Sequence, residues 1–232
     1  MQKIAILQSN YIPWKGYFDI INDVDLFIFY DDVQYTKHDW RNRNRIKTPD
    51  GVKWITIDVE SHITQLIYEV TFKNKRWNIK QWETIKQFYG KAPFFKQYRP
   101  FFEDLYLGKA YESLSEFNQY SIQQIAGEIL GIKTKFADSR IYEGTKKKTD
   151  RLIDILTKAG ASTYISGPAA KAYIEKDKFI DAGINLIYKN YSDYPIYPQL
   201  YESFEHGVTI LDLIYNVGAD APWYIWGWRE AY

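Results

Sequence analysis

Short apolar strands that alternate with amphipathic helices constrain the fold of this chain more than any other feature. Residues 3–8 form an apolar run, residues 14–22 have the spacing of a short amphipathic helix, and residues 25–30 form a second apolar run. Pro13 stands just before the helix, a position that proline favours. A strand–helix–strand unit of this kind predicts parallel strands joined by a right-handed crossover.

The same alternation returns in the C-terminal part of the chain. We expect strands at 133–137, 163–165 and 184–188, and helices at 149–159, 178–182 and 209–215. These elements predict a Rossmann-like α/β fold with a mainly parallel sheet and a C-terminal α/β half.

A helical insertion is expected between the two α/β parts. Residues 76–131 have near-helical apolar spacing, Pro93 and Pro100 punctuate them, and the longest helix, 112–130, ends before Gly131. We therefore divide the chain into an N-terminal α/β half (1–75), the insertion (76–131) and a C-terminal α/β half (132–232). The three parts are expected to form one integrated domain.

The segment after the second strand is polar and basic. Residues 36–47 carry five basic side chains against one acidic residue, Asp39, which gives them a net charge of +4. We expect this segment to be a loop, followed by a turn at 48–51. Strands at 53–59 and 66–72 are expected to form a hairpin around a loop at 60–65.

Composition excludes several classes of protein. The chain has no Cys, so disulfides, thiolate nucleophiles and Cys-ligated metal sites are excluded, and its three His are far apart, so we expect no metal site. The net charge of +1 argues against a nucleic-acid partner, for which we considered an RNA-binding module. No apolar stretch is long enough to span a membrane, and we expect a cytoplasmic protein.

Carboxylates, amides and guanidinium groups follow the second strand in a dense run. Asp31 and Asp32 are candidate proton acceptors, and the arginines suit bidentate contacts with phosphate. We assign substrate binding in this run to Gln34, Tyr35, Lys37, Trp40, Arg41, Asn42, Arg43 and Asn44. The competing interpretation is a solvated loop with local ion pairs.

The turn after the first strand supplies the second group of candidates. Free amides at a helix N-terminus form a natural anion site, and we assign substrate binding to Gln8, Asn10, Tyr11 and Trp14. The layout resembles that of the nucleotidyltransferase superfamily, but Trp14 and Tyr17 stand where that superfamily has two histidines. The alternative is that these aromatic residues belong to the core.

Two further segments complete the candidate site. Ser166, Gly167 and Lys171 follow the strand at 163–165, where a glycine permits close backbone approach to an anion. Aromatic residues make up 18% of the chain, and Tyr194, Tyr197 and Gln199 are assigned to a platform for a sugar ring. His206 is a candidate base, although a lone histidine near a helix start is more often structural. The loops at 9–16, 31–47 and 166–171 each follow a strand, so we expect them to converge.

The same segments resemble the WbqC-like family over nearly the whole chain, from Ile4 to about Ala219. The resemblance is carried by five motifs in order, at 8–17, 31–46, 164–168, 194–199 and 209–218. It implies a bacterial enzyme of surface-polysaccharide biosynthesis such as O-antigen synthesis, which attaches an acyl or aminoacyl group to the amine of a nucleotide-linked amino sugar.

Three points about function stay open at this stage. The enzyme is either an N-acyltransferase or aminoacyltransferase, or an ATP-dependent amide ligase, so acyl-coenzyme A or ATP is the possible co-reactant. The alternative is a carbohydrate- or nucleotide-binding protein without catalysis. A homo-oligomer is possible.

Overall fold

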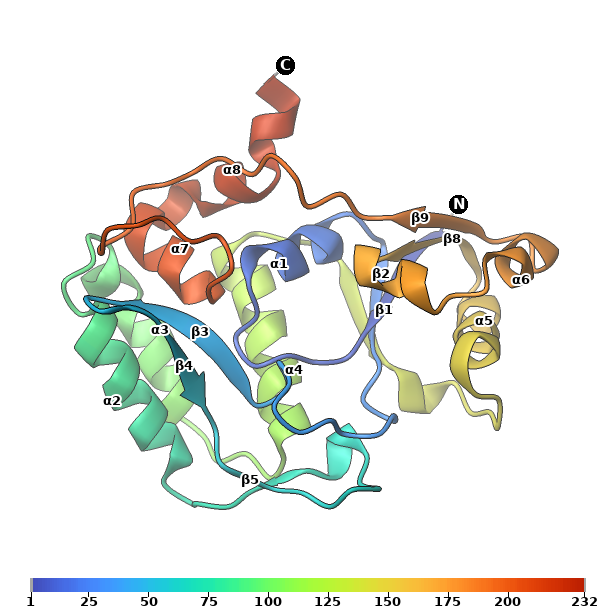
Figure 1. Cartoon of the computed structure of the whole chain (residues 1–232), viewed down its shortest axis with the longest axis horizontal. Helices are drawn as coiled ribbons and strands as arrows, with labels where there is room; N and C mark the ends of the chain where they lie inside the picture. The colour runs from blue at the N-terminus through green and yellow to red at the C-terminus, as the bar shows by residue number, and fades with distance from the viewer. Residues whose placement is uncertain (1, 232) are drawn as a thin grey trace.

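The computed structural model describes residues 2–231 and contains a five-stranded, fully parallel sheet (Figure 1). The sheet consists of β1 (Gln2–Leu7), β2 (Leu26–Phe29), β7 (Lys135–Asp138), β8 (Ala161–Ser166) and β9 (Asn185–Tyr188). Their order is β7-β2-β1-β8-β9, with Ile4 paired to Leu26 on one side and to Tyr164 on the other. The predicted Rossmann-like α/β fold with a parallel sheet is confirmed.

The side of the sheet to which the chain adds strands changes at β1. From β1 the chain runs outward to β2 and later to β7, and then returns to place β8 and β9 on the opposite side of β1. The carboxyl ends of β1 and β8 are therefore neighbours whose chains leave in different directions. In open parallel sheets this reversal opens a crevice in which ligands bind.

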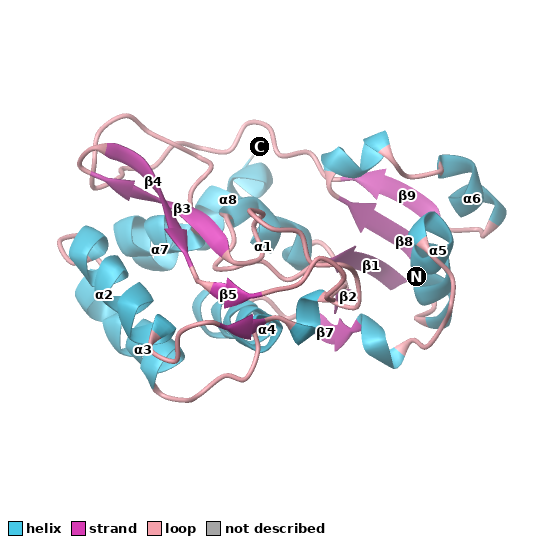
Figure 2. Cartoon of the chain, turned by 60° about the horizontal axis from the view of Figure 1, so that its bottom comes forward, coloured by secondary structure: helices cyan, strands magenta, loops and turns pink. Residues whose placement is uncertain are grey.

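Helices cover both faces of the sheet. Side chains of Ile6 and Tyr164 point to the face covered by α5 (Lys148–Lys158) and α6 (Lys176–Asp181), where they join one apolar cluster. Ala5 and Phe27 belong to the larger cluster on the other face, under α1 (Lys15–Asn22). Figure 2 shows α5 and α6 at the sheet's end of the molecule and the helical block at the other. Burial of both faces explains why the central strands β1 and β2 are largely apolar.

The basic segment is only partly a loop. Residues Arg43–Thr48 form β3, which pairs antiparallel with β4 (Gly51–Thr56) around the expected turn. The expected hairpin of 53–59 with 66–72 is present only at its ends, where β5 (Val59–Glu60) pairs with β6 (Thr71–Phe72), because residues 53–56 pair with β3 instead. The sequence of β3 lacks the apolar alternation of a strand because one of its inward positions is a polar residue, Asn44. Its burial is made possible by hydrogen bonds to the carbonyls of Tyr11 and Ile12.

The insertion is helical, as predicted. It contains α2 (Trp77–Tyr89), α3 (Phe95–Leu107) and α4 (Leu114–Gln124), and a π-helical turn (Ile125–Ile129) continues α4. Pro100 lies inside α3 instead of ending it. Pro100 and Lys96 are both exposed, so water can bind the carbonyl that the missing N–H leaves free.

The C-terminal segment packs back on α1. It forms α7 (Ile210–Val217) and α8 (Ala221–Ile225), and the guanidinium of Arg229 makes two hydrogen bonds of 2.9 Å to the buried carboxylate of Asp19. No helix within residues 2–231 is both long enough and apolar enough to cross a membrane.

Candidate functional site

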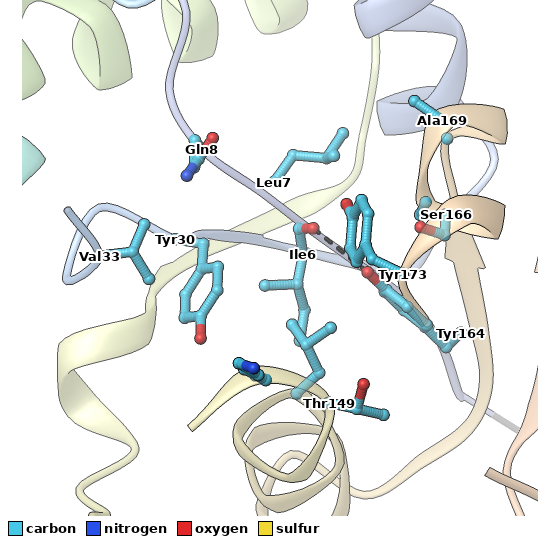
Figure 3. Close-up of a pocket in the computed structure, with 14 residues that line it drawn as sticks. Ile6, Leu7, Gln8, Tyr30, Val33, Thr149, Tyr164, Ser166, Ala169 and Tyr173 are labelled. Atoms are coloured by element: carbon cyan, nitrogen blue, oxygen red, sulfur yellow. Dashed lines mark hydrogen bonds between the residues drawn. The ribbon is translucent and has the colours of Figure 1, made fainter. Parts of the chain in front are cut away.

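A cleft of 660 Å³ lies where the strand order reverses, at the carboxyl ends of β1 and β8 (Figure 3). Ile6, Leu7 and Gln8 contribute its β1 side, and Tyr164 and Ser166 contribute its β8 side. The other lining residues come from the segment after β2, from the first turns of α5 and from the segment after β8: Tyr30, Val33, Lys148, Thr149, Leu152, Gly167, Ala169, Ala170 and Tyr173. We call this the switch-point cleft.

The walls of the switch-point cleft combine apolar surface with neutral donors. Burial, together with the charge of Asp32, raises the pKa of Tyr30 to about 12. Burial also raises the pKa values of Tyr164 and Tyr173. These phenols stay protonated at neutral pH and can donate hydrogen bonds. The hydroxyl of Tyr164 already donates a long hydrogen bond of 3.5 Å to the Ile6 carbonyl (Figure 3).

The charge of the switch-point cleft favours an anion. Among the described residues that line it, Lys148 is the one that is charged at neutral pH. The first turn of α5 lines the same wall, no side chain caps that turn, and Lys148 adopts a φ of 52° at the start of the helix. Uncapped N–H groups and the positive end of the helix dipole attract anions.

Arg41 joins the β1 loop to the basic segment. Its guanidinium donates to the side-chain oxygen of Asn10 at 2.7 Å and also to that of Gln8, and Asp39 lies 3.3 Å away. Its charge also lowers the pKa of Tyr173, against the dominant effect of burial. The structure thus brings Gln8, Asn10 and Arg41 together, as the predicted convergence of the loops requires.

Asp31 and Asp32 lie beside the cleft and not in its walls. Asp31 is fully buried, accepts hydrogen bonds from the Ser9 N–H at 2.8 Å and from Gln119 at 3.0 Å, and also binds the Ser115 hydroxyl. Asp32 accepts a hydrogen bond from Ser139 at 2.5 Å and pairs with Arg151 at 3.2 Å. The oxygens of both carboxylates are therefore already engaged by groups of the protein itself.

His206 lies away from both carboxylates. Its ring packs against Phe204 at 4.5 Å and near Tyr194 at 6.4 Å, and its Nδ1 atom is buried with no hydrogen-bond partner in the described part of the chain. Burial and the charge of Lys15 lower the pKa of His206. His206 is not among the described hydrogen-bond and ion-pair partners of Asp31 and Asp32.

Tyr194, Tyr197 and Gln199 do not form an exposed platform. Tyr194 and Tyr197 are buried, and their hydroxyls donate to Asp19 at 2.5 Å and to Asp212 at 2.8 Å. Gln199 donates to Asp212 at 2.7 Å. Their polar groups are taken up by hydrogen bonds to buried carboxylates, so the expectation of a sugar surface at these residues is wrong.

The remaining predicted residues fall into three groups. Tyr11, Asn42 and Asn44 are buried, and Asn44 donates to the carbonyls of Tyr11 and Ile12. Gln34, Tyr35 and Lys37 lie farther along the segment after β2, where Tyr35 and Lys37 line an open groove. The exposed Lys171 lies over the ring of Tyr188, 5.2 Å from its centroid, and is not among the cleft-lining residues.

Trp14 and Trp40 line a second, smaller cleft of 280 Å³, together with Asn10, Pro13, Asn44, Arg45 and Gly207. We call this the tryptophan cleft. Gln8 in the first cleft and Asn10 in the second are both bound by the guanidinium of Arg41, which therefore connects the two.

Sequence reasoning missed Tyr30, Lys148, Thr149 and Tyr173 as lining residues. Tyr30 was assigned to a strand and Thr149 to a helix, with no functional role. The signal of Tyr30, Lys148 and Thr149 is position, because they follow a strand or begin a helix at the carboxyl edge of the sheet, whereas Tyr173 follows the 3-10 turn Pro168–Ala172. Within residues 2–231 no cluster of carboxylate and histidine side chains has the arrangement of a metal site.

Comparison with known proteins agrees with the resemblance noted from the motifs. A model of the WbqC-like protein family matches residues 8–224. An uncharacterized protein of Mycobacterium tuberculosis, Rv1507c, is 43% identical over 227 residues, which are 97% of this chain and 98% of that protein. No solved structure matches the chain. A family match over almost all of the chain shows that it belongs to the WbqC-like protein family.

Proposed function

We propose that the chain binds a nucleotide-linked amino sugar at the switch-point cleft and transfers an acyl or aminoacyl group to the amine of that sugar. The observation that carries the proposal is the position of the cleft, at the reversal of strand order between β1 and β8. Open α/β sheets bind nucleotides at this position.

The chemistry of the walls supports a nucleotide as the ligand. Ile6, Leu7 and Val33 offer apolar surface to a base, while hydroxyl groups such as that of Ser166 can bind a ribose. Lys148 and the uncapped first turn of α5 suit phosphate, and Arg41 adds a guanidinium beside Gln8.

The reaction requires an activated acyl donor, for which an acyl thioester of coenzyme A, a charged carrier or an acyl adenylate is suitable. The amine nitrogen attacks the acyl carbonyl carbon, a C–N bond forms, and the C–S bond of a thioester or the C–O bond of an adenylate breaks. The leaving group takes the bonding electrons, and the proton of the amine passes to a base. Asp32 is partly exposed and lies in the chain between the cleft-lining residues Tyr30 and Val33, whereas Asp31 is fully buried, so we assign the base to Asp32.

A binding protein without catalysis is the second candidate. It is favoured by one observation, which is that the ion pair with Arg151 and the hydrogen bond from Ser139 already occupy Asp32. Both contacts would have to give way before Asp32 could bind the amine of a substrate.

Mass spectrometry separates the two candidates. The protein is incubated with nucleotide-linked amino sugars and with ATP plus amino acids or acyl-coenzyme A, and the masses of the sugar nucleotides are measured. A new mass that corresponds to one acyl or aminoacyl group supports the enzyme. Binding of sugar nucleotides without any new mass supports the binding protein, and the absence of binding at the switch-point cleft contradicts both. Since nucleotide-linked sugars are cytoplasmic metabolites, we place the protein in the cytoplasm.

A further inference from the structure

We propose that the tryptophan cleft is a subsite for a pyranose sugar ring, which stacks on Trp40 and is held by amide and guanidinium groups at its edge. The inference deepens the proposed function, since it assigns the sugar part of the ligand to residues of the β3–β4 hairpin and the β1–α1 loop. It replaces the sugar platform that the sequence suggested at Tyr194 and Tyr197.

The exposed aromatic surface follows from the register of the hairpin. Arg45 is directly opposite Trp54, and alternation along the two strands places Arg43, Arg45 and Trp54 on one face. The guanidinium of Arg43 lies 4.1 Å from the ring centroid of Trp54, and the rings of Trp40 and Trp54 are 5.1 Å apart. Trp40 and Trp54 are 40% and 47% exposed, so this face keeps large aromatic rings in contact with solvent.

Exposure of these rings distinguishes them from the other aromatic residues near the site. Tyr11, Tyr194 and Tyr197 are buried, and their hydroxyl groups form hydrogen bonds within the protein. Two adjacent, half-exposed tryptophans beside a cleft form an apolar surface on which a ring-shaped ligand can stack. Apolar C–H faces of a pyranose stack on such rings, while its hydroxyl groups need polar partners.

Polar partners are present around the same cleft. Asn10 lines it and accepts a hydrogen bond from Arg41 at 2.7 Å, which fixes its carboxamide and leaves the amide N–H groups as donors. Arg45 lines it as well, with its Nε bound to the carbonyl of Gly207 at 2.7 Å. Fixed donors at the edge of an aromatic surface give direction to the binding of a hydroxylated ring.

The loop that shapes the cleft is held in a strained conformation. Ile12 has a φ of 34°, which is rare for a β-branched residue. Its carbonyl accepts 2.8 Å hydrogen bonds from the Asn44 side chain and from the Thr209 hydroxyl, which hold this conformation. Strain of this kind concentrates at functional sites, and here it lies between Asn10 and Trp14.

Arg41 explains how one ligand reaches both clefts. Its guanidinium binds Gln8, which lines the switch-point cleft, and Asn10, which lines the tryptophan cleft. A sugar nucleotide with its base in the first cleft and its sugar in the second would pass its diphosphate by this guanidinium. The order base, phosphate and sugar therefore follows the order of the clefts.

The experiment compares Trp40→Ala with Trp223→Ala, a control at a tryptophan that is 47% exposed on α8. Calorimetry measures the affinities for UDP and dTDP and for UDP-glucosamine and dTDP-glucose. Saturation-transfer NMR measures binding of a methyl glucosaminide without any nucleotide. We expect Trp40→Ala to weaken sugar-nucleotide binding about tenfold, to leave UDP and dTDP unchanged, and to remove the NMR signal. Trp40→Phe should restore part of the sugar-nucleotide affinity and part of the NMR signal. Trp223→Ala should change neither the affinity nor the signal.

The outcomes separate this inference from the proposed function. An equal loss for UDP and UDP-glucosamine would mean that Trp40 stacks on the base, which overturns the sugar subsite. A glucosaminide signal that survives Trp40→Ala, together with normal UDP binding, overturns the subsite and leaves the proposed function intact. Loss of the signal in a protein that binds no nucleotide supports the subsite and contradicts the proposed function.

Discussion

The guanidinium of Arg41 donates a 2.7 Å hydrogen bond to the side-chain oxygen of Asn10, across 31 residues of sequence. This contact joins the loop after β1 to the segment after β2, and the bond from Arg41 to Gln8 extends it to the switch-point cleft. One cation thus lies between the two clefts.

Replacement of Arg41 tests the phosphate contact. We expect Arg41→Ala to weaken the binding of a nucleoside diphosphate by about 1.5–3 kcal/mol, because a charge-assisted pair with phosphate is lost. Arg99→Ala is the matched control, since its guanidinium forms an exposed ion pair with Glu103 on α3 and lines neither cleft. Calorimetry with UDP measures both. Equal losses in the two variants would contradict the assignment of the phosphate to Arg41.

A bulky side chain at Ala169 tests the location of the nucleotide. Ala169 is exposed and lines the switch-point cleft, so Ala169→Trp should fill the cleft and abolish nucleotide binding with little change in stability. Ala172→Trp changes an exposed residue of the same turn that is not among those lining the cleft. Normal nucleotide binding by Ala169→Trp would move the site elsewhere.

Asp31 is expected to act on stability. Asp31→Asn keeps the size of the side chain but leaves one of its buried donors, Ser9 N–H, Ser115 or Gln119, without an acceptor. We expect the free energy of unfolding to fall by about 1–3 kcal/mol. Urea denaturation measures the loss. A variant as stable as the parent protein but inactive would instead identify Asp31 as the base.

Asp212 makes the stability of the fold depend on pH. Burial raises its pKa to about 6, while hydrogen bonds from Tyr89 and Tyr197 and the charge of Lys47 oppose the shift. The charge of Asp212 in turn acts on the buried Lys15. Because the folded protein binds this proton more tightly than the unfolded chain, Asp212 stabilises the fold at low pH.

This contribution of Asp212 is present below about pH 4 and is lost as the pH rises through 6. We expect the stability difference between the parent protein and Asp212→Asn to shift by about 2–3 kcal/mol between pH 4 and pH 7. Urea denaturation at several pH values gives the difference. A constant difference over this range would show that Asp212 is charged throughout.

The ion pair of Arg229 with Asp19 should fasten the C-terminal segment. Asp19 is fully buried and also binds Lys189 at 2.8 Å, so Arg229→Ala leaves the carboxylate partly neutralised. We expect the free energy of unfolding to fall by about 1–2 kcal/mol and the segment after α8 to become sensitive to proteases. Arg99→Ala, which breaks an exposed pair with Glu103, should cost less than about 0.5 kcal/mol. Similar losses in the two variants would contradict a special role for Arg229.

The sequence by itself determined the parallel α/β architecture and the convergence of the loops. Apolar runs such as 25–30 and the amphipathic pattern of 14–22 depend on neighbours a few residues away, so periodicity is enough to assign them. The positions of Gln8, Arg41 and Ser166 after strands predicted a meeting at the carboxyl edge of the sheet. Gln8 and Ser166 line one cleft there, and Arg41 is bound to Gln8.

Only the tertiary structure decided which polar residues are free to bind a ligand. Tyr197 and Trp40 looked alike in the sequence, yet Tyr197 is buried against Asp212 while Trp40 is half-exposed beside a cleft. Strand β3 was also decided at this level, because burial of Asn44 requires carbonyls 32 and 33 residues away. The physical reason is that desolvation and hydrogen bonding depend on partners distant in sequence, whereas the period of a helix or strand depends on local residues.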